Sequence, residues 1–207
     1  MWVVKLGGSL ARSETLRGWL AALARAGRGR AVIVPGGGRY ADAVRGEQRR
    51  WKFDDSAAHS MALLAMDQYG QQLVAIGNQA RPRAFEAAST NKEIRSALER
   101  GAVAVWIASR MAESDATLPR DWGLTSDSLA AWLARGLGAP GLALIKSVVV
   151  DETEISAAEL AARDWIDLRF PAFLRGSRFE VRLFGVGQEK LLERTLGGVT
   201  EGLRVTA

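Results

Sequence analysis

The sequence predicts an α/β fold, a three-layer αβα sandwich with a mostly parallel central sheet. Short runs rich in Val, Ile and Leu alternate along the chain with amphipathic helix patterns, which is typical of parallel sheets covered by helices. Two of these runs, within residues 2–10 and 32–39, end abruptly in glycines. Such runs indicate buried strands that deliver a backbone turn to the carboxyl edge of a sheet.

The composition fits one globular domain over residues 1–207, since 48% of the residues are hydrophobic and 25% are charged. No apolar run reaches the length of about 18 residues that a membrane span needs. The chain enters a strand at once rather than a signal peptide, and it has no cysteine for disulfides or thiolate metal sites. We therefore expect a cytoplasmic protein that does not act at a membrane.

The net charge of +5 raises the question of a nucleic-acid partner. The arginines are scattered over helix-like stretches, with one dense cluster at Arg45, Arg49 and Arg50. The seven tryptophans do not interleave with basic residues as they would on a base-stacking surface. We expect no nucleic-acid partner, because small anionic substrates fit the charge equally well.

The first half of the chain predicts helices and strands in alternation. A helix should begin at the N-cap Ser13 and end at Gly27. A strand at 31–35, a short helix near 39–46 and a polar loop at 45–52 follow. Asp54, Asp55 or Ser56 caps a long helix that should run to about residue 74 and, because of its length, is a candidate for contact with a second subunit. Residues 77–88 read as irregular.

The second half continues the alternation. We expect a helix from Ser89 or Thr90 to residue 99, a strand at 103–108, a surface loop at 109–123 and a helix at 125–137. A strand at 142–150 and a three-turn helix with Ser156 and Glu159 in a capping box should follow. A compact segment at 167–174, a strand at 179–184, a helix at 188–196 and a short strand near 203–206 complete the prediction.

The two glycine turns predict a two-sided phosphate cradle. Their residues are Gly7, Gly8 and Ser9 after the first strand, and Gly36, Gly37 and Gly38 after the second. Glycine lets main-chain N–H groups face an anion without a Cβ in the way, and a helix pattern after each turn directs its dipole to the same place. The chain contains neither a Walker P-loop motif nor the glycine motif of dinucleotide-binding folds.

Two lysines interrupt strands that otherwise read as buried. Lys5 lies in the first strand and Lys146 in the run Leu-Ala-Leu-Ile-Lys-Ser. A buried lysine is costly unless it is paired, so both predict an anion or a carboxylate partner. Each could instead reach solvent from a strand end. Two such lysines could bracket one phosphoryl group, whose transfer needs mainly positioning and charge neutralisation.

Asp127 lies in the stretch Leu-Thr-Ser-Asp-Ser-Leu-Ala-Ala. As an acid in the first turn of a helix it could simply favour the helix dipole. Alternatively, because it faces the same sheet edge, it could pair with both lysines and hold them in place.

These motifs resemble those of the amino acid kinase superfamily, in which a strand with K-x-G-G-S opens the chain, a triple-glycine turn ends the second strand and T-[ST]-D-[ST]-x-A-A opens a helix. Residues 58–70 and 121–130 are similar to a small branch that phosphorylates aminomethylfuran-methyl phosphate in methanofuran biosynthesis. The resemblance implies the amino acid kinase fold and an ATP- and Mg²⁺-dependent kinase whose small-molecule acceptor is itself a phosphate. It also implies a homo-oligomer.

The resemblance also implies roles for individual residues. Lys5, Lys146 and Asp127 would be catalytic, with Asp127 organising the lysines. The nucleotide and its phosphates would meet Gly7, Gly8, Ser9, Lys146, Ser147 and Gly185. The acceptor would meet Gly36, Gly37, Gly38, Arg39, Asp55, His59 and Ser126. No protein-bound metal is expected from the residues.

Several of these roles have simpler alternatives. His59, the single histidine, could be a packing residue rather than a donor to a substrate phosphate, and Arg39 could be solvated. Asp55 could cap a helix rather than meet a substrate ammonium. The superfamily motifs V-D-G, N-G and G-T are altered here to Val150-Asp151-Glu152, Phe184-Gly185 and Gly202-Leu203, and no later G-x-x-x-K stretch supplies a second lysine. Isopentenyl phosphate, uridylate or amino-acid kinase activity, or a non-catalytic nucleotide- or oxyanion-binding protein, are the alternative functions.

Overall fold

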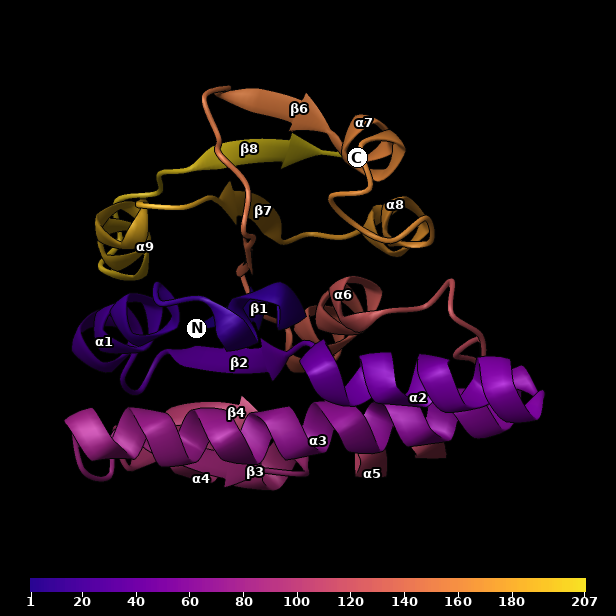
Figure 1. The fold of residues 1–207 in the computed structure, drawn as a ribbon. Helices are drawn as coiled ribbons and strands as arrows, with labels where there is room; N and C mark the ends of the chain where they lie inside the picture. Colours follow the sequence, from indigo (N-terminus) through magenta and orange to yellow (C-terminus); the bar gives the residue numbers. More distant parts are fainter.

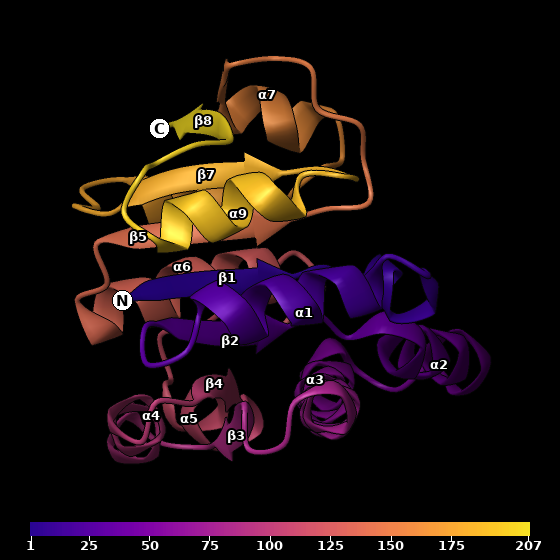
Figure 2. The same cartoon turned by 90° about the vertical axis from the view of Figure 1, so that its left-hand side faces the viewer.

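The computed structural model describes residues 1–207 and contains an eight-stranded sheet between two layers of helices (Figures 1 and 2). The strand order is β3-β4-β2-β1-β5-β7-β8-β6, and only the β7–β8 pair is antiparallel. The predicted α/β sandwich with a mostly parallel sheet is confirmed. None of the helices is long and apolar enough to cross a lipid bilayer.

The strands are β1 (Trp2–Leu6), β2 (Ala31–Pro35), β3 (Phe85–Ala88), β4 (Val103–Trp106), β5 (Gly141–Ile145), β6 (Glu154–Ser156), β7 (Glu180–Phe184) and β8 (Leu203–Thr206). The helices are η1 (Gly8–Arg12, a 3-10 helix), α1 (Leu16–Ala26), α2 (Gly38–Trp51), α3 (Asp55–Ala80), α4 (Asn91–Glu99), α5 (Ser109–Ser114), α6 (Ser126–Leu137), α7 (Ala157–Ala162), α8 (Phe170–Leu174) and α9 (Glu189–Leu196).

Two hydrophobic cores lie on the two faces of the sheet. Alternate residues of each central strand face opposite sides, so that Val3 joins one core and Val4 the other. The helices α1 and α9 cover one face, and α6, α7 and α8 cover the other; Figure 2 shows α1 and α9 in front of the strands and α6 and α7 behind them. Because β1, β2 and β5 are covered on both faces, they are apolar throughout except at Lys5.

The helices after the second glycine turn are longer than the sequence pattern suggested. The expected polar loop at 45–52 is wrong, because α2 continues to Trp51 and ends at Lys52 in a left-handed conformation. Its buried side is narrow, with only Ala41 and Val44 buried, and two arginines in the last turn favour the helix dipole. The helix α3 runs to Ala80 rather than residue 74, and the side chain of Asp54 caps it by accepting from the Ala57 N–H at 2.7 Å.

Three further segments differ from expectation. The strand β3 lies in the stretch read as irregular, where Asn78 bonds the Phe85 main chain and Phe85 is buried. The helix α5 lies in the expected surface loop. The strand β5 ends at Ile145 rather than 150, so Lys146 is the first residue beyond the sheet edge.

Smaller differences concern helix starts near the turns. Thr15, rather than Ser13, holds the N-cap position of α1, and the Ser13 hydroxyl accepts from the Thr15 N–H. The three-residue strand β6 precedes α7, which has six residues rather than three turns. Ser156 does cap α7, accepting from the Glu159 N–H at 3.1 Å.

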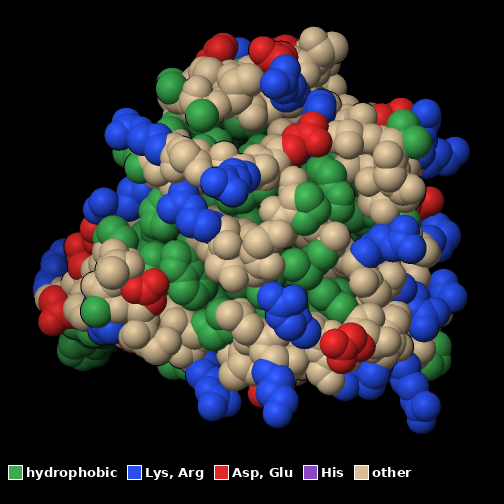
Figure 3. All heavy atoms as spheres, turned by 180° about the vertical axis from the view of Figure 1, so that it is seen from behind, with side chains coloured by type: hydrophobic (Ala, Val, Ile, Leu, Met, Phe, Trp, Pro, Cys, Tyr) green, Lys and Arg blue, Asp and Glu red, His purple; other side chains and the backbone are tan.

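The surface charge is dispersed on the face seen in Figure 3. Lysine and arginine side chains are spread there among acidic, apolar and neutral groups. Several of the arginines of the chain are paired, such as Arg100 with Glu86 and Arg163 with Glu152.

Candidate active site

The site is built where three parallel strands end side by side. The last residue of β1, Leu6, is in register with Pro35 of β2 and with Ile145 of β5. The chain that follows β1 stays between its neighbours, because Gly7 donates to the Ile145 carbonyl at 3.1 Å and Gly36 donates to the Leu6 carbonyl at 2.9 Å. Ligands of parallel α/β sheets bind beyond this edge of the strands.

A buried lysine–aspartate–lysine cluster lies at this edge. The Asp127 carboxylate is 3.0 Å from Lys5 Nζ, and it accepts two bonds from Lys146 Nζ at 2.7 and 2.8 Å. The three residues are 5%, 4% and 9% exposed in the order Lys5, Asp127, Lys146. Asp127 lies in the first turn of α6, where Thr125 is the N-cap and accepts from its N–H.

The protonation of this cluster follows from burial and charge. Burial alone raises the pKa of Asp127, but the charges and hydrogen bonds of Lys146 and Lys5 outweigh it and lower that pKa to about 2. Burial lowers the pKa of Lys146 to about 8, against the attraction of Asp127. The cluster therefore has one carboxylate for two ammonium groups when both lysines are protonated, and it can attract an anion.

The two glycine turns pack backbone against backbone. A Cβ on Gly8 would lie 2.5 Å from the Gly38 nitrogen, and a Cβ on Gly36 would lie 2.4 Å from the Gly8 nitrogen. Gly38 also has a φ of 52°, a conformation that favours glycine. Only glycine at these positions permits such a close approach. Since the N–H groups of Gly7 and Gly36 donate to main-chain carbonyls, those left to face an anion are on Gly8, Gly37 and Gly38.

The other side of the cluster offers polar groups from β5 and β7. Ser9 and Ser147 share a hydrogen bond of 2.8 Å between their hydroxyls. The Gly185 N–H donates to the Gln188 side chain, and a Cβ on Gly185 would lie 2.4 Å from the Val148 carbonyl. Val149 and Val186 are exposed here. This side could hold a nucleotide, with hydroxyls and glycines near its phosphates.

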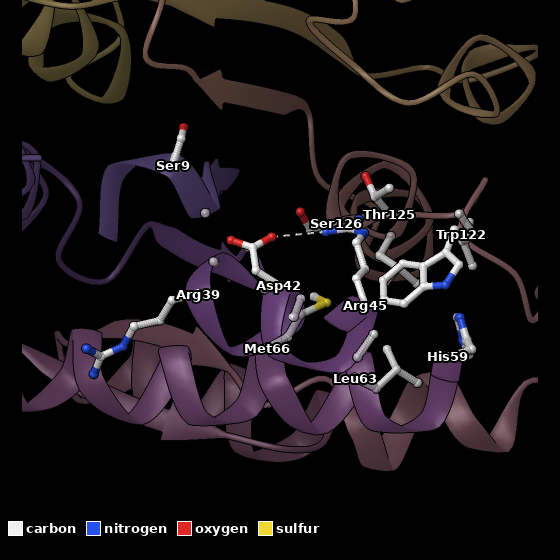
Figure 4. A pocket seen from close by; sticks show the side chains of 18 of the residues that line it. Ser9, Arg39, Asp42, Arg45, His59, Leu63, Met66, Trp122, Thr125 and Ser126 are labelled. Atoms are coloured by element: carbon white, nitrogen blue, oxygen red, sulfur yellow. Dashed lines mark hydrogen bonds and ion pairs between the residues drawn. The ribbon is translucent and has the colours of Figure 1, made fainter. Parts of the chain in front are cut away.

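A cavity of about 390 Å³ lies between α2, α3 and the start of α6 (Figure 4). Among the residues expected to bind phosphates or acceptor, its lining includes Gly8, Ser9, Gly36, Gly37, Gly38, Arg39, His59 and Ser126. Gly7, Ser147 and Gly185 lie outside this lining. Asp55 is also outside it, and its carboxylate is exposed and accepts from Gln48 at 2.8 Å.

The lining also includes charged and aromatic residues that the sequence analysis did not single out as site residues. They are Arg12, Asp42, Arg45, Asp121 and Trp122. The Arg45 guanidinium lies over the Trp122 ring, 4.2 Å from its centroid, and Trp122 Nε1 donates to Gln48 at 2.6 Å. Asp42 is 3.4 Å from Arg45 and otherwise largely exposed, whereas Asp121 is paired with Arg169.

The start of α6 is anchored by Asp167, which the sequence analysis also missed. Its carboxylate accepts from the main chain and hydroxyl of both Thr125 and Ser128, and from the N–H groups of Arg169 and Phe170. No local pattern could reveal this contact, since Asp167 lies about 40 residues after the helix it holds.

The chain itself offers no cage for a metal ion. No three or more His, Asp or Glu residues converge, and Asp127 is already paired with two lysines. Mg²⁺ commonly binds through substrate phosphates and few protein ligands, so the residues fit an ion that is carried by a nucleotide.

Comparison with known proteins gives consistent results. A model of the amino acid kinase family matches residues 1–149. The [5-(aminomethyl)furan-3-yl]methyl phosphate kinase of Methanocaldococcus jannaschii is 29% identical over 136 residues, which are 65% of this chain and 60% of the relative. The match therefore spans about three fifths of that relative's length.

Solved kinase structures share the fold. Uridylate kinase from Archaeoglobus fulgidus has a TM-score of 0.73 at 17% identity and covers 99% of both chains. UMP kinase from Ureaplasma parvum has a TM-score of 0.71 at 15% identity, covering 100% of this chain and 98% of the other. The curated relative and these structural neighbours are all kinases.

Proposed function

This chain belongs to the amino acid kinase family, and we propose that it transfers the γ-phosphoryl group of Mg-ATP to a small phosphate monoester, forming a diphosphate. The lysine–aspartate–lysine cluster beside the two glycine turns is the observation that carries the proposal. Phosphoryl transfer requires positioning and neutralisation of charge on the transferred group rather than covalent chemistry.

In this proposal Lys5 and Lys146 contact the transferred phosphoryl group. Asp127 holds both ammonium groups within 3.0 Å of its carboxylate and so fixes their positions. The main-chain N–H groups of Gly8 and the second glycine turn bind phosphate oxygens without reorganising during the reaction. The ATP phosphates lie toward Ser9, Ser147 and Gly185, and Mg²⁺ supplies further positive charge when it arrives with the nucleotide.

The acceptor we propose is [5-(aminomethyl)furan-3-yl]methyl phosphate, the compound named for the M. jannaschii relative, which would place the reaction in methanofuran biosynthesis. An acceptor that already bears a phosphate needs its own donors. The cavity supplies the N–H groups of Gly37 and Gly38 and the guanidinium group of Arg12, whereas the Gly36 N–H donates to Leu6 and the Arg39 guanidinium lies over the Tyr40 ring. Its apolar part, with Leu63, Met66, Leu124 and Leu129, suits a small aromatic ring such as furan.

The test is a panel of acceptors with Mg-ATP, in which the product is identified by mass and by ³¹P NMR. We expect the highest kcat/KM with [5-(aminomethyl)furan-3-yl]methyl phosphate, against UMP, isopentenyl phosphate, N-acetylglutamate and aspartate. Lys5→Ala is the control for catalysis at this site and should lower turnover by at least about a hundredfold. Higher kcat/KM with a carboxylate acceptor would overturn the acceptor class, and ATP binding without transfer to any acceptor would indicate a binding protein instead.

A further inference from the structure

His59 is a buried imidazole in the cavity between α2, α3 and the start of α6. It lies in the second turn of α3, is 6% exposed and lines the cavity. The Asp121 main chain lies against one side of the ring and favours its protonated form. With one ring nitrogen at the Asp121 main chain, the other nitrogen is left for a group that enters the cavity.

His59 lies far along α3 from the glycine turns. Gly70 packs against Pro35, the last residue of β2, since a Cβ on Gly70 would lie 3.4 Å from the proline ring. His59 is eleven residues earlier, which places it about 16 Å farther along the helix axis. Figure 4 places Ser9 and Arg39 at one end of the labelled side chains and His59 and Trp122 at the other. One phosphate held by the second glycine turn does not also reach His59.

The surroundings of His59 favour a flat group that donates a hydrogen bond. The Trp122 indole lies beside it in the cavity and is fixed by its bond to Gln48. Burial lowers the pKa of His59, while Glu113 and Asp121 oppose and Arg120 adds to this effect. Arg45 and Asp42, on α2, form a loose pair at 3.4 Å nearby. At neutral pH the imidazole is therefore uncharged, with one nitrogen lone pair free to accept a hydrogen bond.

We propose that His59 and Trp122 recognise the end of the acceptor opposite its phosphate, and that this end carries a protonated amine. The imidazole nitrogen accepts a hydrogen bond from the ammonium, and the indole packs against the ring between amine and phosphate. This inference rests on the proposed function and refines it, because it replaces the expectation that His59 donates to the acceptor phosphate. In such an acceptor the amine and the phosphate lie on opposite sides of the ring.

The test pairs two acceptors with two enzymes. The acceptors are [5-(aminomethyl)furan-3-yl]methyl phosphate and the same furanylmethyl phosphate without the aminomethyl arm. His59→Phe keeps a flat ring but removes the nitrogen; it should raise KM for the amine acceptor about tenfold or more, the scale of one hydrogen bond to a charged group. KM for the acceptor without the amine, and for ATP, should stay within about twofold. Ser60→Ala, at the next residue and outside the cavity lining, is the matched control.

The KM for the amine acceptor should depend on pH in opposite directions if His59 binds the amine and if it binds the phosphate. Protonated His59 would repel an ammonium, so KM for the amine acceptor should rise as pH falls through the His59 pKa. Protonation would instead tighten the binding of a phosphate held by His59. The phosphate group of both acceptors titrates in the same way, so its effect cancels in the ratio of the two KM values. His59→Gln, measured by the same assay after circular dichroism confirms folding, serves if the phenylalanine variant does not fold.

The results distinguish a failure of this inference from a failure of the proposed function. If the parent phosphorylates both acceptors and His59→Phe or His59→Gln raises both KM values equally, this inference is overturned and the proposed function stands. A parent that phosphorylates neither acceptor but readily phosphorylates another compound would overturn both. An unchanged KM for the amine acceptor in a folded variant also removes His59 from recognition.

Discussion

Replacing Asp127 by asparagine removes one charge from the centre of the buried cluster and keeps the shape of the side chain. Lys5 and Lys146 then remain buried without a carboxylate, although each lies within 3.0 Å of its oxygens in the parent. If Asp127 served only the helix dipole, the same change would cost little, since Thr125 and not Asp127 is the N-cap of α6.

The geometry sets the expected size of the effect. Each ion pair at about 3 Å is worth about 6 kcal/mol in an effective dielectric of about 20, before the charges are desolvated. Net losses after removal of one partner of a buried pair are about 3–5 kcal/mol. We expect Asp127→Asn to lower the free energy of unfolding by about 3–5 kcal/mol at pH 7 and turnover by at least about a hundredfold.

The loss of stability should depend on pH in a defined direction. Burial lowers the pKa of Lys146 to about 8, and loss of the Asp127 attraction lowers it further. A lysine whose folded-state pKa lies below its unfolded value of about 10.4 destabilises the fold when protonated, and this penalty fades as the pH rises toward the unfolded value. The free energy of unfolding of the variant should therefore increase from pH 7 toward pH 10.

Urea unfolding, followed by tryptophan fluorescence, measures these changes beside steady-state turnover. The double variant Asp127→Asn/Lys146→Met should unfold at higher urea than Asp127→Asn, because it removes one unpaired buried charge. Thr90→Ala, which removes the N-cap of the distant helix α4, is the control and should cost about 1 kcal/mol without loss of turnover. The reasoning would be refuted if Asp127→Asn kept the turnover of the parent, or if the double variant were less stable than Asp127→Asn.

Three further outcomes follow from the same structure. Gly8→Ala should lower turnover severely, because its Cβ would lie 2.5 Å from the Gly38 nitrogen, whereas Gly46→Ala on α2, whose Cβ meets open space, should keep turnover and add about 0.5–1 kcal/mol of stability; equal turnover of the two variants would contradict the cradle. Leu64 is 54% exposed on a face of α3 whose exposed positions from 56 to 80 carry no charge. We therefore expect a homo-oligomer that Leu64→Lys converts to a monomer in light scattering, and a monomeric parent would contradict this prediction. ATP binding near pH 8 should take up a fraction of a proton, because phosphates beside Lys146 raise its pKa from about 8; calorimetry in two buffers with different ionisation enthalpies would show equal heats if this is wrong.

The sequence was sufficient to predict the fold and the cluster because their signals are local. Buried strands ending in glycines can be recognised from a few residues, and a lysine in such a strand requires an anionic partner nearby. Lys5, Lys146 and Asp127 do meet, although they are distant in sequence, because parallel strands and the helices that follow them bring their ends to one edge. The lengths of α2 and α3 were underestimated because apolar residues do not recur at helical spacing along their outer faces. The outer face of α2 is polar, and that of α3 is uncharged.

The cavity between α2, α3 and the start of α6 could not be predicted in the same way. Its walls come from α2, α3 and the segment before α6, and the positions of Arg45 and Trp122 were read as surface loops. Arg45 lies on the exposed part of α2, and its role appears only when Trp122, 77 positions later, packs against it at 4.2 Å. Local composition marks such residues as solvated, because the partner that orders them is supplied by tertiary structure.

The arrangement of the cluster and the cavity suggests how stability and activity are balanced. A fold optimised only for stability would not bury two lysines around one aspartate, since a well-packed apolar trio of similar size costs less desolvation. The uncompensated positive charge is tolerated at the end of β1 and β5, next to glycine turns whose N–H groups also face outward. The ligand that relieves this charge must be strongly anionic, and it must fit directly against the main chain of the glycine turns. A polyphosphate meets both conditions. In the proposed reaction, the charge that destabilises the free protein is also the charge that stabilises the transferred phosphoryl group.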